Sequence, residues 1–160
     1  MSGAEIAVAS TQYLTFRLGE ETFALDVAEV REILDFTTVT KVPRTPSFMR
    51  GVINLRGSVV PVMDLRLKFG MSATEQTVNS CVIVVELTIE DDQVVVGVLA
   101  DAVQEVIDLE PEQVEPAPRI GTRLNMEFIV GMGKHNGGFM MILDLDKIFQ
   151  SSDLATDEAA

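Results

Sequence analysis

The sequence predicts an all-β protein made of two related units. Short apolar, β-branched runs alternate with turns rich in glycine, proline or asparagine along most of the 160 residues, as in sandwiches and barrels. The segment V-R-E-I at 30–33 recurs 73 positions later as V-Q-E-V, and M-D-L at 63–65 recurs 80 positions later as L-D-L. Each unit is too small to bury much apolar surface alone, so we expect the two to share an apolar seam. The hydrophobic residues of the two V-x-E-[IV] segments are candidates to line it.

Composition excludes several classes of protein. Hydrophobic residues make up 47% of the chain, but no apolar run reaches the ~20 residues that a membrane helix requires. Residues 1–11 lack the basic and apolar segments of a signal peptide. The single cysteine, Cys81, rules out an internal disulfide, suits a reducing cytoplasm and is predicted to be a small buried hydrophobe.

The charge of the chain is strongly negative but unevenly distributed. The net charge of −13 disfavours nucleic-acid binding, which requires a basic surface. Residues 41–68 nevertheless hold six basic side chains against one acid, whereas residues 86–115 hold ten acids and no base. This pattern fits either two solvated faces or a dipolar molecule whose two ends suit different partners.

The first half is predicted to begin and end with hairpins. Asp26 is placed to cap a helical turn, because Val27, Val30, Ile33 and Leu34 follow at helical spacing. The predicted elements are strands at 13–18 and 23–27, the helical turn, a strand at 37–42 ended by prolines, a hairpin at 51–63 and a helical turn at 64–69.

The second half follows a polar linker at 71–80. Its predicted elements are a hairpin of 81–89 and 94–99, a strand or helical turn at 103–109, a proline-containing loop at 110–118, a hairpin of 128–132 and 139–145, and a helical turn at 146–150. We expect a disordered tail at 1–11, one domain at 12–150 and an acidic tail at 151–160. The approximate subdomains are 12–70 and 79–149, between which strands can cross.

Catalytic and metal-binding patterns are missing from the sequence. His135, the only histidine, lies in a glycine-rich turn and is predicted to be solvated, so neither a zinc site nor a Ser-His-Asp constellation is expected. Asp64 and Asp144 occupy equivalent repeat positions, which helix capping explains more simply than acid–base chemistry. The eight methionines are expected to fill the core or to form an adaptable binding surface. We therefore expect a binding module without a cofactor rather than an enzyme.

Arg56 is the anomalous residue of the predicted hairpin at 51–63. It borders an apolar block, where an unpaired cation is costly to bury. The equivalent turn of the second unit, H-N-G-G at 135–138, has no arginine, so the architecture does not require this charge. Arg56 is either a solvated turn residue or a residue that recognises a partner, and we favour the second interpretation.

Several motifs give the chain a family resemblance. N-L-R-G at 54–57, P-V-M-D-L-R at 61–66 and F-A-L-D-V-A-E-V-R-E-I at 23–33 resemble the CheW family of bacterial chemotaxis coupling proteins, and the resemblance extends over about residues 12–149. It implies two five-stranded, SH3-like β-barrels packed on a hydrophobic seam, without catalytic activity. It also implies a cytoplasmic adaptor that links the histidine kinase CheA to chemoreceptor tips, in arrays at the inner face of the cytoplasmic membrane.

The resemblance further implies two sets of binding residues. Receptor-binding positions of the family lie at the seam and match Val30, Glu32, Gly51 and Arg56. A receptor tip is a helical hairpin, so the implied mode is a helix in a groove. Positions that contact the regulatory domain of CheA lie at the barrel ends and match Val39, Thr40, Lys41, Val42, Glu115, Arg119 and Ile120. The offset of 73 pairs Val42 with Glu115, so the two ends are expected to be pseudo-symmetric.

Two alternatives stay open. The chain also fits a coupling protein of a parallel chemosensory system, such as one that controls twitching motility. It fits less well a small barrel protein that binds a ligand at the seam, because convergent polar groups are scarce.

Overall fold

The computed structural model of the chain describes residues 10–36, 39–116 and 128–149. Its strands are β1 (Thr11–Leu18), β2 (Glu21–Asp26), β3 (Val30–Asp35), β4 (Met49–Leu55), β5 (Ser58–Met63), β6 (Cys81–Ile89), β7 (Asp92–Ala100), β8 (Ala102–Leu109), β9 (Val114–Glu115), β10 (Ile129–His135) and β11 (Gly138–Leu143). Its short helices are η1 (Val27–Glu29), α2 (Leu65–Lys68), η2 (Pro111–Gln113) and α3 (Leu145–Ile148).

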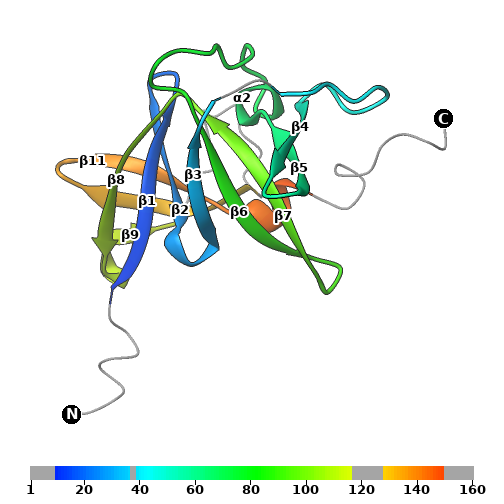
Figure 1. The fold of residues 1–160 in the computed structure, drawn as a ribbon. Helices are drawn as coiled ribbons and strands as arrows, with labels where there is room; N and C mark the ends of the chain where they lie inside the picture. The colour runs from blue at the N-terminus through cyan, green and yellow to red at the C-terminus, as the bar shows by residue number, and fades with distance from the viewer. Residues whose placement is uncertain (1–9, 37–38, 117–127, 150–160) are drawn as a thin grey trace.

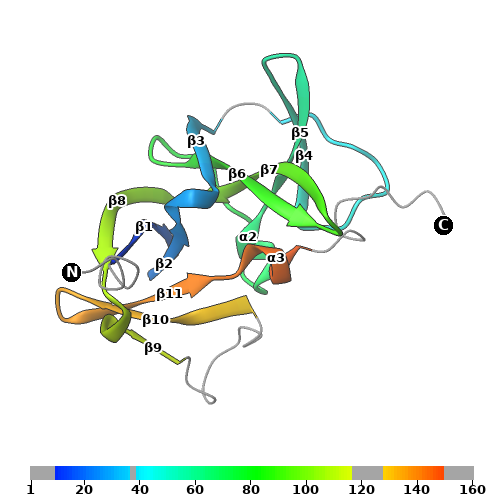
Figure 2. The same ribbon diagram turned by 90° about the horizontal axis from the view of Figure 1, so that it is seen from below.

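The described strands form two curled sheets that pack against each other (Figures 1 and 2). One sheet has the strand order β8-β1-β2-β11-β10-β9 and the other the order β3-β6-β7-β5-β4. Most neighbours are antiparallel, but β5 runs parallel to β7, and β11 runs parallel to β2. The predicted all-β architecture of two small barrel-like units is confirmed, and the two-residue strand β9 extends the first sheet.

Each sheet combines strands from both sequence repeats. The hairpin β1–β2 pairs with β8 and β11 of the second repeat, whereas the hairpin β6–β7 pairs with β3 and β5 of the first. In Figure 1, the blue strand β1 accordingly lies beside the green strand β8. The stretches 12–70 and 79–149 are thus repeats along the sequence, while each barrel-like unit is assembled from strands of both.

The repeat extends to local irregularities of the strands. β3 and β8 each carry a shift in pairing register, at Arg31 and Gln104, which lie 73 positions apart in the sequence. β4 and β10 carry another, at Arg50 and Val130, which lie 80 positions apart. A bulge bends a strand and increases its twist, which lets such short sheets curl around an interior.

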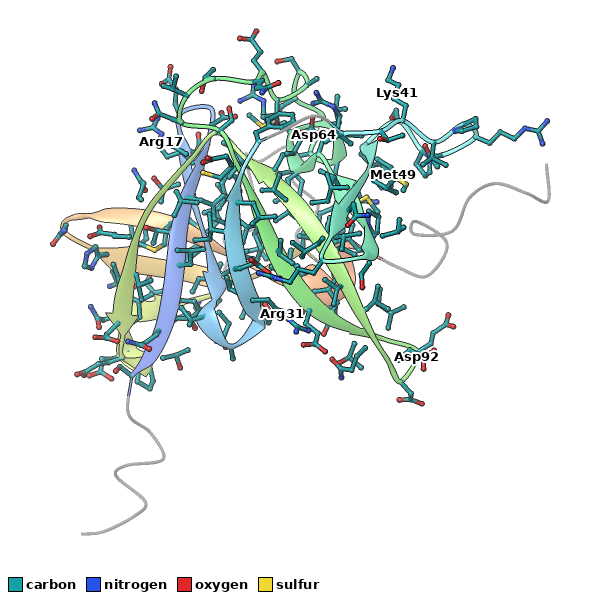
Figure 3. The ribbon with its side chains drawn as sticks, in the orientation of Figure 1. Arg17, Arg31, Lys41, Met49, Asp64 and Asp92 are labelled. Carbon is teal, nitrogen blue, oxygen red and sulfur yellow. The ribbon has the colours of Figure 1, made fainter. Side chains whose placement is uncertain are left out.

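The main apolar core lies between the two sheets. It takes Leu14 and Phe16 from β1 and Ile83 and Val85 from β6. Intervening residues such as Val84 point to the other face of the strand, where each sheet encloses a smaller cluster of its own. Figure 3 shows side chains filling the space between the sheets. The predicted apolar seam is therefore the largest cluster of the molecule.

The two hairpins that precede α2 and α3 end in the same way. Asp64 accepts a hydrogen bond from the backbone of Arg66 at 3.1 Å, and Asp144 accepts one from the backbone of Lys147 at 3.4 Å. Both aspartates are helix N-caps, as the sequence predicted.

The helical turn predicted after Asp26 is shorter than expected. Asp26 caps the single turn Val27–Glu29, with its carboxylate 2.9 Å from the backbone nitrogen of Ala28, but β3 begins at Val30. The helix-like spacing of Val30 and Ile33 has another cause. The bulge at Arg31 lets both residues pair with seam-facing residues of β6, so they share a face at a spacing of three.

Three other local predictions are wrong. Within 37–42, the described residues contain only an isolated bridge between Thr40 and Val52 instead of a strand, because prolines follow at once; residues 37–38 lie outside the described residues. Cys81 is half-buried rather than buried, since it starts β6 at the rim of the sheet. His135 ends β10 and is 28% exposed, instead of lying in the turn.

Candidate functional site

Arg56 lies at the tip of the β4–β5 hairpin and makes a bidentate ion pair with Glu32 of β3. Its Nη1 and Nη2 atoms donate to Oε2 and Oε1 of Glu32 at 2.6 and 2.8 Å. Because β3 and β4 are the two edge strands of their sheet, this ion pair joins the opposite edges of the sheet. The Arg56 side chain is 72% exposed and that of Glu32 25% exposed, so the charged pair is open to a partner.

The ion pair fixes the charge of both groups. Hydrogen bonds from the guanidinium lower the pKa of Glu32, and the same bonds raise the pKa of Arg56. Both side chains therefore stay ionised at neutral pH and present a fixed dipole at the surface.

Arginine is an unusual residue for the backbone conformation at position 56, which has a positive φ. Arg56 and Gly57 have φ values of +52° and +88°, and the equivalent Asn136 and Gly137 have +53° and +79°. Two-residue hairpin loops with positive φ at both positions favour Asn-Gly, which the second hairpin has. Arginine is disfavoured there because its Cβ meets the backbone in this region. The turn geometry does not explain Arg56, which favours its interpretation as a residue that recognises a partner.

Apolar side chains flank the ion pair on the seam side. Val30 packs against the main core, and Ile33, one residue beyond Glu32, is 43% exposed. On β8, Val103 packs against the same core and Val106 is 52% exposed. These pairs lie 73 positions apart in the sequence, so both edge strands β3 and β8 present one exposed hydrophobe beside the seam. The V-x-E-[IV] segments thus bring apolar residues to the seam, as the repeat indicated.

Gly51 is buried and lies beneath the loop that connects β3 and β4. Its φ is +145°, and a Cβ there would come within 2.1 Å of the backbone oxygen of Thr40. Thr40 and Val52 exchange backbone hydrogen bonds of 2.9 and 2.8 Å directly beside it. Gly51 therefore cannot offer a side-chain contact to a receptor; it lets the 39–40 segment lie directly on β4.

The residues predicted to contact a kinase lie on two pseudo-equivalent segments. Val39 and Val42 are half-buried, whereas Thr40, Lys41 and Glu115 are exposed. On β9, Glu115 pairs in register with Met132 and makes an ion pair of 2.6 Å with Lys134. Arg119 and Ile120, the other predicted residues, lie outside the described residues.

The structure corrects the register between these two segments. Thr40 bridges Val52, whereas Glu115 pairs with Met132, 80 positions after Val52. Glu115 is therefore equivalent to Thr40, at an offset of 75, and not to Val42, at 73. Thr40 lies 10 positions after Val30, whereas Glu115 lies 12 positions after Val103, so the offset of 73 that holds at Val30 has become 75 here.

A buried carboxylate that the sequence did not single out for this role anchors the base of the 39–50 loop. Asp64 is fully buried and accepts hydrogen bonds from Arg50 at 2.8 Å and from the backbone and hydroxyl of Thr74 at 2.9 and 2.8 Å. The guanidinium of Arg50 also lies 5.5 Å from the ring centre of Phe36. Asp64 is thus both a helix cap and the centre of a polar network that joins β4 to the linker at 71–80.

Glu29 carries the most perturbed carboxyl near the candidate site. Burial, followed by the nearby charges of Asp146, Asp26 and Asp144, raises its pKa to about 7. Glu29 directly precedes Val30, so its ionisation changes the charge at the start of β3.

Metal coordination has little support within the part of the chain that the structure describes. That part contains no group of three or more His, Cys, Asp or Glu side chains placed to hold a metal ion. His135 approaches Glu105 at 4.0 Å, at the place where the other unit has the Arg56–Glu32 ion pair. None of the helices in the described ranges is long and apolar enough to span a membrane.

Comparison with known proteins gives the family of the chain. The CheW-like domain family matches residues 12–153. The chain belongs to the CheW family. A chemotaxis protein CheW of Klebsiella aerogenes is 36% identical over 144 residues, which cover 90% of this chain and 84% of that protein. A chemotaxis protein CheW of Rhizobium meliloti is 33% identical, with 89% of each chain covered. The scaffolding protein TtCheW of Thermoanaerobacter tengcongensis has a structure that superposes with a TM-score of 0.79 at 33% identity, covering 90% of each chain.

Proposed function

We propose that this CheW-family protein is a non-catalytic adaptor that couples the histidine kinase CheA to chemoreceptor cytoplasmic tips. The observation that carries the proposal is the exposed Arg56–Glu32 ion pair beside exposed apolar residues at the seam, in a chain whose relatives are chemotaxis CheW proteins. The protein works in the cytoplasm, recruited to receptor arrays at the inner face of the cytoplasmic membrane. These relatives do not favour a role in twitching motility or in small-ligand binding.

On the receptor side, the proposed contact is a helix laid against the seam-side margin of β3. Val30 and Ile33 supply the apolar surface, against which an amphipathic helix can lay its own apolar face. Arg56 and Glu32 set the register, because a charged pair at the rim discriminates between correct and incorrect alignments. Gly51 acts indirectly, by holding the 39–40 segment against β4.

On the kinase side, the proposed contacts are the two pseudo-equivalent barrel ends. One end carries Val39, Thr40, Lys41 and Val42, and the other carries Glu115. Arg119 and Ile120, which lie outside the described residues, are proposed to contribute to the second contact. Two similar ends that each accept a barrel of the CheA regulatory domain allow head-to-tail contacts, which close into rings.

Replacement of Arg56 tests the receptor side. Arg56→Ala should retain the fold, since the side chain is 72% exposed, and should weaken pulldown by receptor tips. Lys134→Ala is the matched control, because it removes an exposed ion pair from the equivalent hairpin of the other unit. Pulldown that is unchanged in Arg56→Ala would remove Arg56 from the site.

Replacement of one apolar residue at each barrel end tests the kinase side. Val42→Glu and Ile120→Glu should each weaken binding of the CheA regulatory domain in a titration and leave receptor-tip pulldown intact. Kinase binding that survives both substitutions would show that the barrel ends are not the contact.

A further inference from the structure

The loop between β3 and β4 is a protruding basic segment on an acidic protein. Residues 36–48 contain no aspartate or glutamate but two basic side chains, Lys41 and Arg44, although the chain as a whole carries a net charge of −13. Figure 1 shows this loop, in cyan, extending from the body of the two sheets. In Figure 3 the Lys41 side chain points away from the sheets. The loop is therefore a second surface, distinct from the apolar seam both in its position and in its charge.

Two cations of this loop differ from nearly all others in having no partner. Most basic side chains of the described residues are paired with an acid, stacked on a ring or bonded to a carbonyl; examples are Arg31, Arg50 and Arg66. Lys41 and Arg44 are exposed, and within the described ranges neither has a carboxylate or carbonyl partner. The chain contains 25 acidic residues, yet these two neighbouring cations pair with none of those described. They can therefore attract an anionic group of another molecule.

The two cations border a concave surface with further hydrogen-bond donors. A pocket of about 300 Å³ is lined by Lys41, Val42, Arg44, Thr45, Ser47 and Arg50, among others. We propose that this pocket binds a carboxylate-bearing segment of the CheA regulatory domain, through Lys41 and Arg44. The inference rests on the proposed kinase contact at 39–42 and names the chemistry of that contact.

The loop is held in shape before any partner arrives. The hydroxyl of Thr45 donates to the carbonyl of Val42 at 3.0 Å, and the backbone of Met49 donates to that of Pro46 at 3.0 Å. Arg50 is fixed at the base by Asp64. Arg44 has a φ of +64°, a conformation that non-glycine residues adopt rarely and that clusters at functional sites. A preorganised loop loses less entropy on binding, which favours a docking role over a solvated tether.

Two other occupants fit the surface less well. Nucleic acid would be repelled by the remainder of a chain with a net charge of −13. A second copy of this chain could offer its acidic stretch at 86–115, but the pocket adjoins Val42, which belongs to the proposed kinase contact. Self-association through the loop is therefore an outcome that the experiment must detect.

Charge reversal in the full-length protein tests the proposal. Lys41→Glu and Arg44→Glu should each lower the affinity for the purified CheA regulatory domain by about tenfold in calorimetric titrations, because each places a carboxylate opposite a carboxylate. Lys147→Glu is the matched control, since Lys147 is an exposed cation on α3 that has no side-chain ion pair within the described residues, and it should change the affinity less than about twofold. When NaCl is raised from about 50 to about 300 mM, the affinity of the unmodified protein for the regulatory domain should decrease. This decrease should be steeper than that of either loop variant.

The outcomes separate this inference from the proposed function. Loss of kinase binding in Val42→Glu, with full binding in both charge reversals, would retain the loop as a kinase contact and overturn the acidic-segment proposal. Full binding in all three variants would overturn both. Loop variants that abolish a dimer of the chain in light scattering, but leave kinase affinity unchanged, would assign the pocket to self-association and likewise overturn the proposal.

Discussion

The hairpins β4–β5 and β10–β11 are the same structure with different charges. β5 and β11 have identical patterns of burial, the first strand of each hairpin carries a bulge, and each hairpin leads into a helix capped by aspartate. At the tip, however, the first hairpin has Arg56 bound to Glu32, where the second has Asn136, with His135 4.0 Å from Glu105. At the bulge the first has Arg50, and the second has an exposed Val130.

This difference separates what the fold needs from what function adds. A positive-φ turn, a bulge and a capping aspartate are present in both hairpins, so they belong to the architecture. The cations at Arg50 and Arg56 occur only in the first hairpin, together with their carboxylate partners. The two cations differ in role: Arg50 is held by the buried Asp64 and stabilises the base of the loop, whereas the exposed Arg56–Glu32 pair is the one proposed to meet a partner.

Removal of the capping aspartates should show the largest contrast between the hairpins. Asp64→Ala leaves Arg50 and Thr74 without their buried acceptor and should lower the free energy of unfolding by about 3–5 kcal/mol. Asp144→Ala removes only a cap and should cost about 1 kcal/mol. Urea denaturation of both variants measures the difference, and equal losses would show that the Asp64 network adds nothing beyond capping.

Alanine at the two glycines that directly follow the bulges should give the next largest contrast. Gly51→Ala places a Cβ 2.1 Å from the Thr40 oxygen at a φ of +145° and should cost about 3 kcal/mol. Gly131→Ala meets the Glu115 oxygen at 2.9 Å without positive φ and should cost about 1–2 kcal/mol. Thermal unfolding compares the two, and the 39–42 loop is expected to shift only in Gly51→Ala. A smaller loss at Gly51 than at Gly131 would contradict this account of the close approach.

Exchange of the turn residues should separate turn stability from partner binding. Arg56→Asn supplies the residue that the positive-φ position favours, so the melting temperature should hold or rise, while affinity for receptor tips should fall by about tenfold. Asn136→Arg should leave receptor affinity unchanged. Receptor binding that survives Arg56→Asn would assign the arginine to the barrel rather than to recognition.

The smallest expected effect concerns pH and Glu29. Its pKa in the folded protein, about 7, lies above the ordinary value, so the folded state holds a proton that the unfolded state has released. Stability from this group is fully present below the ordinary pKa and is lost as pH rises to about 7. After allowance for solvent screening, the loss is about 1–2 kcal/mol. Denaturation at several pH values measures how the free energy of unfolding depends on pH. Glu29→Gln should remove this dependence, whereas Glu75→Gln, an exposed control, should retain it. An equal pH dependence in both variants would contradict the role of Glu29.

Much of the fold could be predicted from the sequence because the repeats carry its local signals. The hairpin about Arg56-Gly57, the capping roles of Asp64 and Asp144 and the shared seam all follow from turn residues, caps and apolar runs. The segment at 30–35 has the apolar spacing of a helix although it forms a strand. A bulge at Arg31 converts the two-residue alternation of a strand into the three-residue spacing of a helix.

What could not be predicted depends on contacts between distant residues. The exchange of strands between repeats, such as β1 with β8, follows from pairing that no local pattern encodes. The intramolecular ion pair of Arg56 could not be predicted from the sequence, because Glu32 lies 24 positions away on another strand. The equivalence of Glu115 with Thr40 required the pairing of β9 with β10, and the burial of Asp64 required Thr74 of the linker.

The central claim is that one chain bridges receptor tips and kinase, with Arg56 needed on the receptor side only. Co-sedimentation of receptor-tip assemblies with the kinase, with and without this chain, tests it directly. The account predicts that the kinase pellets only when the chain is present, and that the Arg56→Ala chain recruits much less kinase to the pellet although it still binds the kinase in solution. Kinase that pellets equally without the chain, or an Arg56→Ala chain that recruits it fully, would contradict the account.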